Sequence, residues 1–361
     1  MHGHVAARRG ARGPRGREGS SAAGCNRSHV NTQFALLVCV LGLGLVFEFV
    51  NGFHDAANAI ATAVATRVLR PAQAVIMAGV LNFAGAVTGT AVATTVGKGL
   101  VDPHVVTQAT IAAGLVAAIG WDFFTWYLGM PTSSSHALLF GVLGAGVATG
   151  GLRAVEVPGV VKVGIGIGYS PVIALLAAGA LIVGLYWLVY RYPPARITRV
   201  FGRLQLLSSM YMAFSHGGND GQKTMGIMSL ALFTYGALGP TFYVPVWVMV
   251  VAAFAMGAGT AAGGWRIVKT MGFRLTKLHP IDGFAAETAA ATTIEVATRL
   301  GIPISTTHAI NGAILGVGVS KGVRWVRWSV ARNIVTAWVL TVPACFGLGW
   351  GLMRLAAMLG L

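Results

Sequence analysis

Two short polar motifs stand inside apolar sequence, and they hold the residues best suited to chemistry. Residues 51–58 read Asn-Gly-Phe-His-Asp-Ala-Ala-Asn, and residues 217–223 read Gly-Gly-Asn-Asp-Gly-Gln-Lys. Aligned on Asp55 and Asp220, both fit G-x-(H/N)-D-x-x-(N/K), and we call them the first and second aspartate motifs. A carboxylate at membrane depth is costly unless it meets a cation or a proton. Both aspartates are therefore predicted to bind a coupling ion or the substrate; the alternative is that helix N-termini satisfy them.

A second pair of motifs is rich in hydroxyl groups. Residues 131–137 read Pro-Thr-Ser-Ser-Ser-His-Ala, and residues 303–309 read Pro-Ile-Ser-Thr-Thr-His-Ala; we call them the first and second hydroxyl motifs. Proline is tolerated in the first helical turn, and Ser or Thr caps the free N–H groups there. The positive end of the helix dipole attracts an anion. The motifs are therefore predicted to start two half-helices that converge on one anion, the alternative being simple hydrogen bonding between helices.

The predicted ligands fall into two sets. The substrate-binding set is Thr132, Ser133, Ser134, Ser135, Asn219, Gln222, Lys223, Ser305, Thr306 and Thr307. The coupling-ion set is Asp55, Asn58, Asp220 and Glu287. Glu287 precedes the second hydroxyl motif and is the first candidate for a proton carrier, with a structural ion pair as the alternative; Glu48 is another carboxylate at membrane depth. Lys223 takes the place of Asn58 in the second copy, where it could pair with Asp220, contact the anion or replace a coupling cation.

Histidines accompany the motifs two and two. They are His54, His136, His216 and His308. A buried histidine is most often a hydrogen-bonded core residue, so these four are predicted to support the ligands without binding the ion themselves. The three cysteines are scattered and show no metal-ligand spacing. The sequence thus predicts no resident metal and no cofactor.

The recurrence of the motifs indicates an internal duplication. The aspartate motifs recur at an offset of 165 residues (Asp55 to Asp220), and the hydroxyl motifs follow in the same order at 172 (Pro131 to Pro303). The chain is 55% hydrophobic and only 10% charged, with a mean hydropathy of +0.71, whereas soluble domains are about 25% charged. We therefore expect an all-α polytopic membrane protein of two inverted repeats, with broken helices, Pro/Ser/Thr-tipped hairpins and about 10–12 membrane segments.

Basic residues orient this arrangement. The formal charge of +16 comes from residues in the N-terminal tail and in loops, a distribution typical of membrane topology and not of nucleic-acid binding. If the basic loops are placed in the cytoplasm and 34–69 and 205–233 are each counted as one broken span, each half crosses the membrane an odd number of times. An odd number of crossings inverts the second half relative to the first. The expected divisions are a disordered tail (1–33), a first repeat (34–190), a basic linker (191–204) and a second repeat (205–361).

The four motifs in this order resemble those of the inorganic phosphate transporter (PiT) family, over about residues 34–359. The resemblance implies an inverted-repeat secondary carrier, often dimeric, in which Asp55, Asn58, Asn219 and Asp220 match ion and phosphate ligands and the hydroxyl motifs match phosphate-binding loops. In sodium-coupled members of this family, both copies of the aspartate motif are similar to G-x-N-D-x-x-N. His54 and Lys223 depart from that pattern and resemble the bacterial low-affinity branch, which is proton-coupled and takes up metal–phosphate complexes.

The function expected is proton-coupled phosphate symport across a bacterial inner membrane by alternating access. Protonated phosphate can donate hydrogen bonds to carboxylates, whereas sulfate only accepts them. Within carriers, the alternatives are a sodium-coupled phosphate permease and a sulfate permease. An intramembrane hydrolase is the alternative from another class, but adjacent Ser135 and His136 on one helix point to different faces, and neither H-E-x-x-H nor G-x-S-x-G occurs. An enzyme is therefore not expected.

Overall fold

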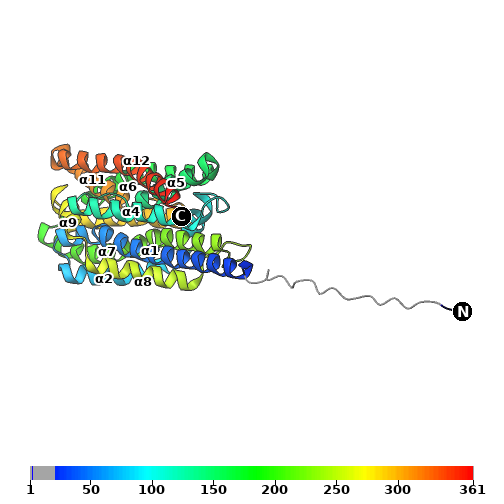
Figure 1. Ribbon diagram of the computed structural model, residues 1–361. Helices are drawn as coiled ribbons and strands as arrows, with labels where there is room; N and C mark the ends of the chain where they lie inside the picture. The colour runs from blue at the N-terminus through cyan, green and yellow to red at the C-terminus, as the bar shows by residue number, and fades with distance from the viewer. Residues whose placement is uncertain (1, 3–20, 361) are drawn as a thin grey trace.

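The computed structural model describes residue 2 and residues 21–360, and these fold into a bundle of α-helices that run side by side (Figure 1). The helices are α1 (Ser21–Ala65), α2 (Pro71–Ala86), α3 (Ala91–Gly99), α4 (Gln108–Leu128), α5 (Ser134–Gly150), α6 (Val157–Val189), α7 (Pro194–Tyr235), α8 (Val246–Ala262), α9 (Trp265–Lys269), α10 (Pro280–Arg299), α11 (Thr306–Lys321) and α12 (Trp328–Met358). Within this part of the chain, extended pairing is limited to two isolated bridges. The predicted all-α class is confirmed.

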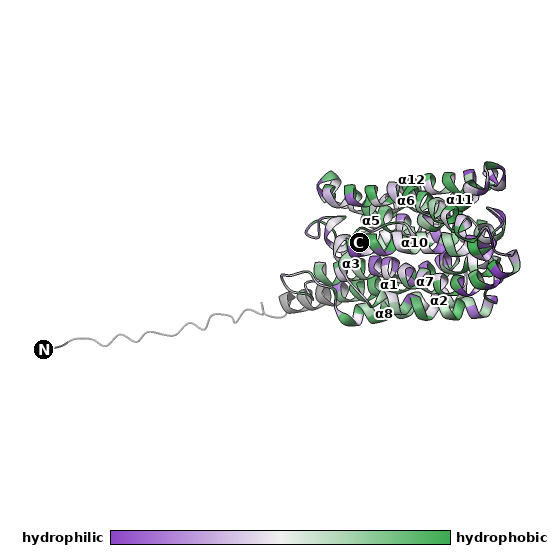
Figure 2. Ribbon diagram, turned by 180° about the vertical axis from the view of Figure 1, so that it is seen from behind, coloured by the Kyte–Doolittle hydropathy of each residue, from purple (hydrophilic) through white to green (hydrophobic). Residues whose placement is uncertain are grey.

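Several helices are long and apolar enough to cross a bilayer. Within the described residues there are five such helices, or up to seven spans when the bent pairs α2–α3 and α8–α9 each count as one. The bends are 69° and 57°, and they are the broken helices of this fold. Figure 2 shows hydrophobic residues along most of the bundle and hydrophilic ones at its ends and among the inner helices. The structure therefore has the form of a multi-pass membrane protein.

The predicted breaks at the aspartate motifs are wrong. Helix α1 continues through residues 51–58, and α7 continues through residues 217–223. The backbone need not open there, because other helices supply partners for the polar side chains. The hairpins predicted at the two hydroxyl motifs, in contrast, are present. Gly129 (φ +66°) and Gly301 (φ +62°) take left-handed conformations that favour glycine, and each turns the chain into the extended residues before α5 or α11.

Two predicted boundaries fall differently in the structure. Residues 1 and 3–20, which make up most of the predicted disordered tail, lie outside the described residues. Helix α1 begins at Ser21, earlier than the predicted boundary at residue 34. The predicted linker, 191–204, lies mostly within α7, which begins at Pro194 with proline in its first turn.

The two halves pack across each other in matching pairs. Helix α1 packs on α8 and α2 packs on α7; α5 packs on α12 and α6 packs on α11. Helices α1 and α7 run antiparallel, because Glu48, before Asp55 in α1, contacts Thr224, after Asp220 in α7, while Thr66 just after α1 contacts Gln205 early in α7. The aspartate motifs therefore meet where the C-terminal part of α1 passes α7.

Two glycines permit the helix crossings between the halves. A Cβ atom on Gly52 would lie 2.3 Å from the Met256 carbonyl oxygen, and one on Gly217 would lie 2.1 Å from that of Asn82. We expect Gly52→Ala to separate α1 from α8 and to destabilise the protein by about 1–3 kcal/mol or more. Thermal unfolding of the detergent-purified protein measures this. Gly42→Ala is the control, because a Cβ there meets nothing within 4 Å; equal melting temperatures for both variants would contradict the crossing.

Candidate functional site

The two motif aspartates lie together at the centre of the bundle. One carboxylate oxygen from Asp55, one from Asp220 and a ring nitrogen of His216 all lie within 4.8 Å of one another, and all three residues are buried. The aspartates come from opposite halves and from antiparallel helices. We call these three residues the central cluster. Both copies of the aspartate motif therefore contribute to one cluster.

Hydroxyl groups of both hydroxyl motifs reach this cluster. Thr306 Oγ1 donates to Asp220 Oδ2 at 2.6 Å, and Thr307 Oγ1 donates to Asp55 Oδ2 at 3.3 Å. From the other half, Ser135 Oγ donates to Asp220 Oδ1 at 3.4 Å. Helices α5 and α11 thus both begin beside the carboxylates, and their first turns contribute donors.

The remaining hydroxyls of the two motifs have other positions. Ser133 and Ser305 are N-caps, accepting from the backbone N–H of His136 at 3.3 Å and of His308 at 3.1 Å. Ser134 is buried and its hydroxyl has no hydrogen-bond partner among the described residues. Capping by the two serines fixes where the positive ends of α5 and α11 point.

Lys223 is the buried cation of the site. Its ammonium forms an ion pair with Asp220 and donates to Ser135 Oγ at 2.5 Å and to the Ile304 carbonyl oxygen at 2.6 Å. A carboxylate, a hydroxyl and a carbonyl oxygen therefore surround one positive charge. Of the three roles considered for Lys223, the geometry shows the pairing with Asp220. Burial of both charges is tolerable because the ammonium is paired and hydrogen-bonded.

The equivalent position in the first copy holds an amide. Asn58 Nδ2 donates to Thr306 Oγ1 at 3.2 Å and to Thr307 Oγ1 at 2.9 Å, while its Oδ1 has no partner among the described residues. A free buried oxygen beside Asp55 is a ligand atom that a cation or a donor on the substrate could use. Asn58 thus ties the first aspartate motif to the second hydroxyl motif.

Residue 54 and its counterpart, Asn219, anchor the motifs in matching ways. His54 Nδ1 lies 2.7 Å from Asp55 Oδ1, and its Nε2 lies 3.1 Å from Thr125 Oγ1. Asn219 Nδ2 donates to Thr298 Oγ1 at 2.8 Å. Thr125 and Thr298 lie near the ends of α4 and α10. Both motifs are therefore fastened to the helix that leads into a hydroxyl motif, and Thr132 joins the first anchor by donating to Thr125 at 2.9 Å.

The other motif histidines differ in their surroundings. His136 and His308 pack edge to face at 4.5 Å, and His308 stacks on Trp338 at 3.9 Å, as expected of residues that brace the hairpins. His216 instead belongs to the central cluster. Its Nδ1 lies 2.9 Å from Asn82 Oδ1, and its Nε2 lies 3.2 Å from Asp220 Oδ2.

Two predicted residues lie away from the central cluster. Gln222 accepts from the backbone N–H of Val92 at 2.9 Å, at the start of α3, and donates to the Gly218 carbonyl oxygen. It caps a helix here and does not line the anion site that was predicted for it. Glu287 accepts from hydroxyl and amide groups of Thr62, Gln205, Ser208 and Ser209, towards the end of α1.

The carboxylates form three levels along α1. Glu48, Asp55 and Thr62 are spaced seven residues apart, about 10 Å per step along a helix. Glu48 accepts from Thr224 at one level, Asp55 meets Asp220 at the next, and Thr62 donates to Glu287 at 2.5 Å at the third. Glu48 and Glu287 therefore flank the central cluster on opposite sides.

Sequence reasoning missed Asp122. This residue of α4 is fully buried, and neither of its carboxylate oxygens has a hydrogen-bond partner among the described residues. Its helix also carries Thr125, which contacts His54 of the first aspartate motif. The signal was present in the sequence, because Asp122 is an acidic residue inside the apolar stretch of residues 107–129, just as Asp55 stands inside apolar sequence.

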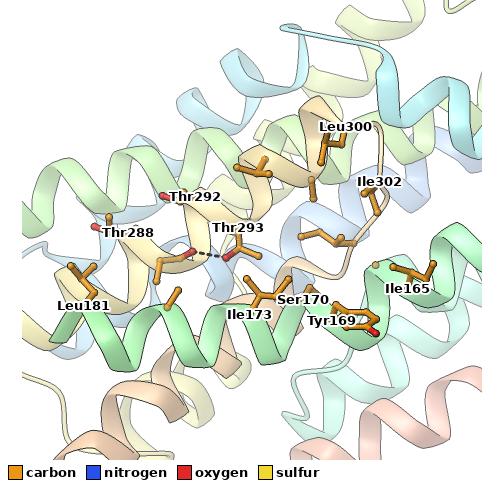
Figure 3. Close-up of a pocket in the computed structure, with 16 residues that line it drawn as sticks. Ile165, Tyr169, Ser170, Ile173, Leu181, Thr288, Thr292, Thr293, Leu300 and Ile302 are labelled. Atoms are coloured by element: carbon orange, nitrogen blue, oxygen red, sulfur yellow. Dashed lines mark hydrogen bonds between the residues drawn. The ribbon is translucent and has the colours of Figure 1, made fainter. Parts of the chain in front are cut away.

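A groove on the outside of the bundle is separate from these charges. It lies between α6 and α10, has a volume of about 580 Å³ and is lined mainly by aliphatic residues (Figure 3). One of its few polar groups, Thr293 Oγ1, donates to the Ala289 carbonyl oxygen of its own helix at 2.8 Å. The groove touches the site only through Ile304, so it is not the place where the anion donors converge.

Anion donors, carboxylates and a fixed cation thus meet at the middle of a membrane-type helix bundle. Such a site, built from both halves and buried, defines a membrane carrier for a small charged solute. Residues 51–349 match the model of the phosphate transporter family, and the chain belongs to that family. It is a multi-pass membrane phosphate transporter and not an enzyme, which confirms the predicted class.

Individual relatives agree with this assignment. A protein of Rhizobium meliloti named "Probable low-affinity inorganic phosphate transporter" is 49% identical over 86% of this chain and 93% of its own length. A Bacillus subtilis protein with the same name is 40% identical over 87% of this chain and 95% of its own. A solved structure titled "The sodium-dependent phosphate transporter" has a TM-score of 0.80 at 24% identity, covering 90% of this chain and 99% of that one. At that identity, the likeness shows the fold.

Proposed function

We propose that this chain carries inorganic phosphate across a bacterial inner membrane by proton-coupled symport, through alternating access, with a divalent cation as a companion of the phosphate. The observation that carries the choice of proton coupling is the position of Lys223. Its ammonium occupies a cage of carboxylate, hydroxyl and carbonyl oxygens, which are also the ligands that a hard cation such as sodium takes. A tethered ammonium fills that cage without any ion from solution.

The donor arrangement favours phosphate as the anion. Ser135, Thr306 and Thr307 supply hydroxyl donors, and Asp55 and Asp220 supply acceptors within the same site. A phosphate that still carries a proton can use both kinds of group, whereas sulfate would leave the buried acceptors unpaired. The names of the Rhizobium meliloti and Bacillus subtilis relatives support the same substrate.

The way the two halves pack on each other supports alternating access through inverted repeats. The central cluster is buried, so the bundle must rearrange to admit a solute from either side. Helices α1 and α7 carry equivalent motifs and run antiparallel, as two elements related by an axis in the membrane plane would. Each half also packs on the other through equivalent helix pairs, so a rocking motion of one half against the other would expose the cluster alternately.

Competition tests the proposed substrate. In proteoliposomes with an inward proton gradient, we expect excess unlabelled phosphate to suppress the uptake of labelled phosphate and an equal excess of sulfate to leave it nearly unchanged. Equal suppression by both anions would favour the sulfate-carrying alternative.

Glu287→Gln tests the proton carrier. Glutamine keeps the shape of the side chain and an acceptor for Thr62, but it cannot bind a proton reversibly. We expect uptake driven by a proton gradient to fall at least about 100-fold, the scale typical of losing a proton-transfer group, while phosphate exchange without a gradient persists. The matched control is Glu295→Gln on the same helix, whose carboxylate pairs at the surface with Arg299. Unchanged gradient-driven uptake in Glu287→Gln would assign Glu287 a structural role only.

A further inference from the structure

A basic pocket opens at the end of the bundle where α1 ends and α10 begins. Its volume is about 710 Å³, and its lining includes Arg67, Lys277, His279, Arg324 and Arg327 but no aspartate or glutamate. We propose that this basic pocket binds a soluble anion that carries two or more phosphate groups. The inference goes beyond the proposed transport of phosphate, because the pocket and the central cluster share no residue.

The four arginine and lysine side chains of the basic pocket are available to an anion. Within the described part of the chain, the ion pairs involve other side chains, so no carboxylate neutralises these four charges. Like charges that face one cavity repel one another, and an anion between them removes that repulsion. Three of the four are arginines, whose planar forks of N–H donors match phosphate oxygens two at a time. The electrostatics therefore favour a ligand that bears phosphate.

The two loops that carry three of these cations are fixed to each other. Thr276, before α10, and Val326, before α12, form an isolated antiparallel bridge. The backbone N–H of Arg327 donates to the Leu275 carbonyl oxygen at 3.0 Å, and Thr276 Oγ1 donates to the Trp325 carbonyl oxygen at 3.0 Å. The loops therefore hold their cations in place before any ligand arrives, and less conformational freedom is lost on binding.

Arg67 occupies a backbone conformation that is unfavourable for an arginine. Its φ is +62°, and within the described part of the chain it is the one non-glycine residue with a positive φ. A side chain disfavours this left-handed region, whereas glycine enters it freely. Glycine would therefore suit the turn after α1 better, and the backbone cost points to a role for the arginine side chain itself. For the same reason, Arg67→Gly removes the charge without disturbing the backbone.

The size and charge of the basic pocket indicate a ligand with more than one phosphate group. Binding sites for small molecules typically have volumes of about 300–1,000 Å³, a range that includes this pocket. A single phosphate group carries about two negative charges at most near neutral pH, so it would leave half of the four cations unpaired. A chain of phosphates can instead contact Arg67 and the cations of both loops at once.

The basic pocket leads towards the buried Glu287. Thr66, which lines the pocket, donates to Gln205 Oε1 at 2.8 Å, and Gln205 Nε2 donates to Glu287 Oε1 at 3.2 Å. By the positive-inside rule, the basic loops place this end of the bundle in the cytoplasm. The ligand is therefore expected to come from the cytoplasm. The polar contacts beneath the pocket favour a soluble anion over a lipid headgroup, whose acyl chains need an apolar wall.

A bound anion is also expected to act on transport. Arg67 belongs to the first half of the chain, whereas Lys277, Arg324 and Arg327 belong to the second. A ligand stabilises the conformation to which it binds most tightly, so an anion that contacts both halves opposes their movement relative to each other. We expect it to slow phosphate transport when present in the cytoplasm, a consequence that rests on the proposed alternating access.

Calorimetry tests the basic pocket independently of transport. The full-length protein in detergent is titrated with inorganic triphosphate at about 0.15 M salt, with excess inorganic phosphate present to occupy the central site. We expect one triphosphate per chain, bound at least about tenfold more weakly in Arg67→Gly and in Arg324→Gln, because each variant loses charge-assisted hydrogen bonds. The matched control is Arg332→Gln, which removes an exposed arginine near the start of α12 that does not line the pocket.

The outcomes decide both the site and the source of its ligand. Equal affinities in wild type, both site variants and the control, or no binding at all, would refute the basic pocket as an anion site. Displacement of triphosphate by ATP would support a nucleoside polyphosphate as the ligand. In nanodiscs, triphosphate binding that disappears when anionic lipid replaces zwitterionic lipid would assign the pocket to headgroups and overturn the choice of a soluble anion.

Separate measurement of phosphate uptake distinguishes this inference from the proposed function. Arginine-dependent triphosphate binding without phosphate uptake would leave the basic pocket standing while the proposed function fails. Proton-driven phosphate uptake by a protein that binds no triphosphate would refute the pocket and leave the proposed function intact.

Discussion

Asp220→Asn is expected to abolish phosphate uptake while the protein still folds and inserts into the membrane. Asparagine keeps the shape of the side chain but removes the charge that pairs with Lys223 and accepts from Thr306. Truncating one partner of a buried, hydrogen-bonded charge pair costs about 2–5 kcal/mol of binding free energy, so the uptake rate is expected to fall at least about 100-fold, or about 2.8 kcal/mol at about 1.4 kcal/mol per tenfold. Initial rates of labelled phosphate uptake in proteoliposomes measure the effect.

Asp55→Asn is expected to give a comparable loss, because Asp55 is the equivalent ligand from the other half. The control is Asp102→Asn in the loop between α3 and α4, where the carboxylate only accepts from the backbone of His104. Gel filtration and thermal unfolding verify that each variant is folded. Wild-type uptake by folded Asp55→Asn and Asp220→Asn proteins would refute the assigned site.

Lys223→Asn is expected to change the coupling ion. The substitution gives the second aspartate motif the residue that the first has at Asn58, and it opens the cage formed by Asp220, Ser135 and Ile304. Without the ammonium, the buried carboxylate needs another cation. We expect proton-driven uptake to fall at least about 100-fold, because truncating one partner of a buried charge pair in a binding site costs about 2–5 kcal/mol of binding free energy, and sodium to restore a measurable part of it.

The matched control for this substitution is Lys98→Asn. Lys98 lies in the last turn of α3, where its ammonium sits 5.5 Å from the centre of the Phe242 ring, outside the central cluster. Its loss is expected to leave the coupling ion unchanged. A Lys223→Asn protein that retains proton-driven uptake and ignores sodium would show that the ammonium does not stand in for a coupling cation.

Much of this architecture could be predicted from the sequence, because membrane insertion leaves few options for the backbone. The apolar runs correspond to helices or bent pairs, and the motif prolines mark real hairpins. The recurrence of the hydroxyl motif predicted that both halves would converge on one site. What joins them, however, is the antiparallel passage of α1 and α7, and close-packed glycines such as Gly52 and Gly217 permit it.

The details that could not be predicted depend on three-dimensional partners. His54 and His216 accompany the two aspartate motifs and each lies beside a carboxylate, yet the other ring nitrogen of His54 contacts Thr125 whereas that of His216 contacts Asn82. Gln222 belongs to the motif but points to the start of α3. The predicted break in α1 was wrong for the same reason, since hydrogen bonds from other helices satisfy the motif side chains without opening the backbone.

An acidic residue inside apolar sequence is a signal that could have identified one more buried carboxylate near the site. Glu48 and Glu287 attracted notice as acids at membrane depth, and the structure places them on either side of the central cluster. Asp122 meets the same criterion, because it is a fully buried acid in the apolar helix α4. Acidic residues inside apolar runs deserve equal weight whether or not they recur.

The most direct test of the account is labelled phosphate uptake into proteoliposomes under an inward proton gradient or an inward sodium gradient, each with and without a divalent cation. The account predicts uptake driven by the proton gradient, enhanced by the divalent cation and indifferent to sodium. Uptake driven by sodium and unaffected by the proton gradient would contradict it, because the cage around Lys223 would then not replace a coupling ion.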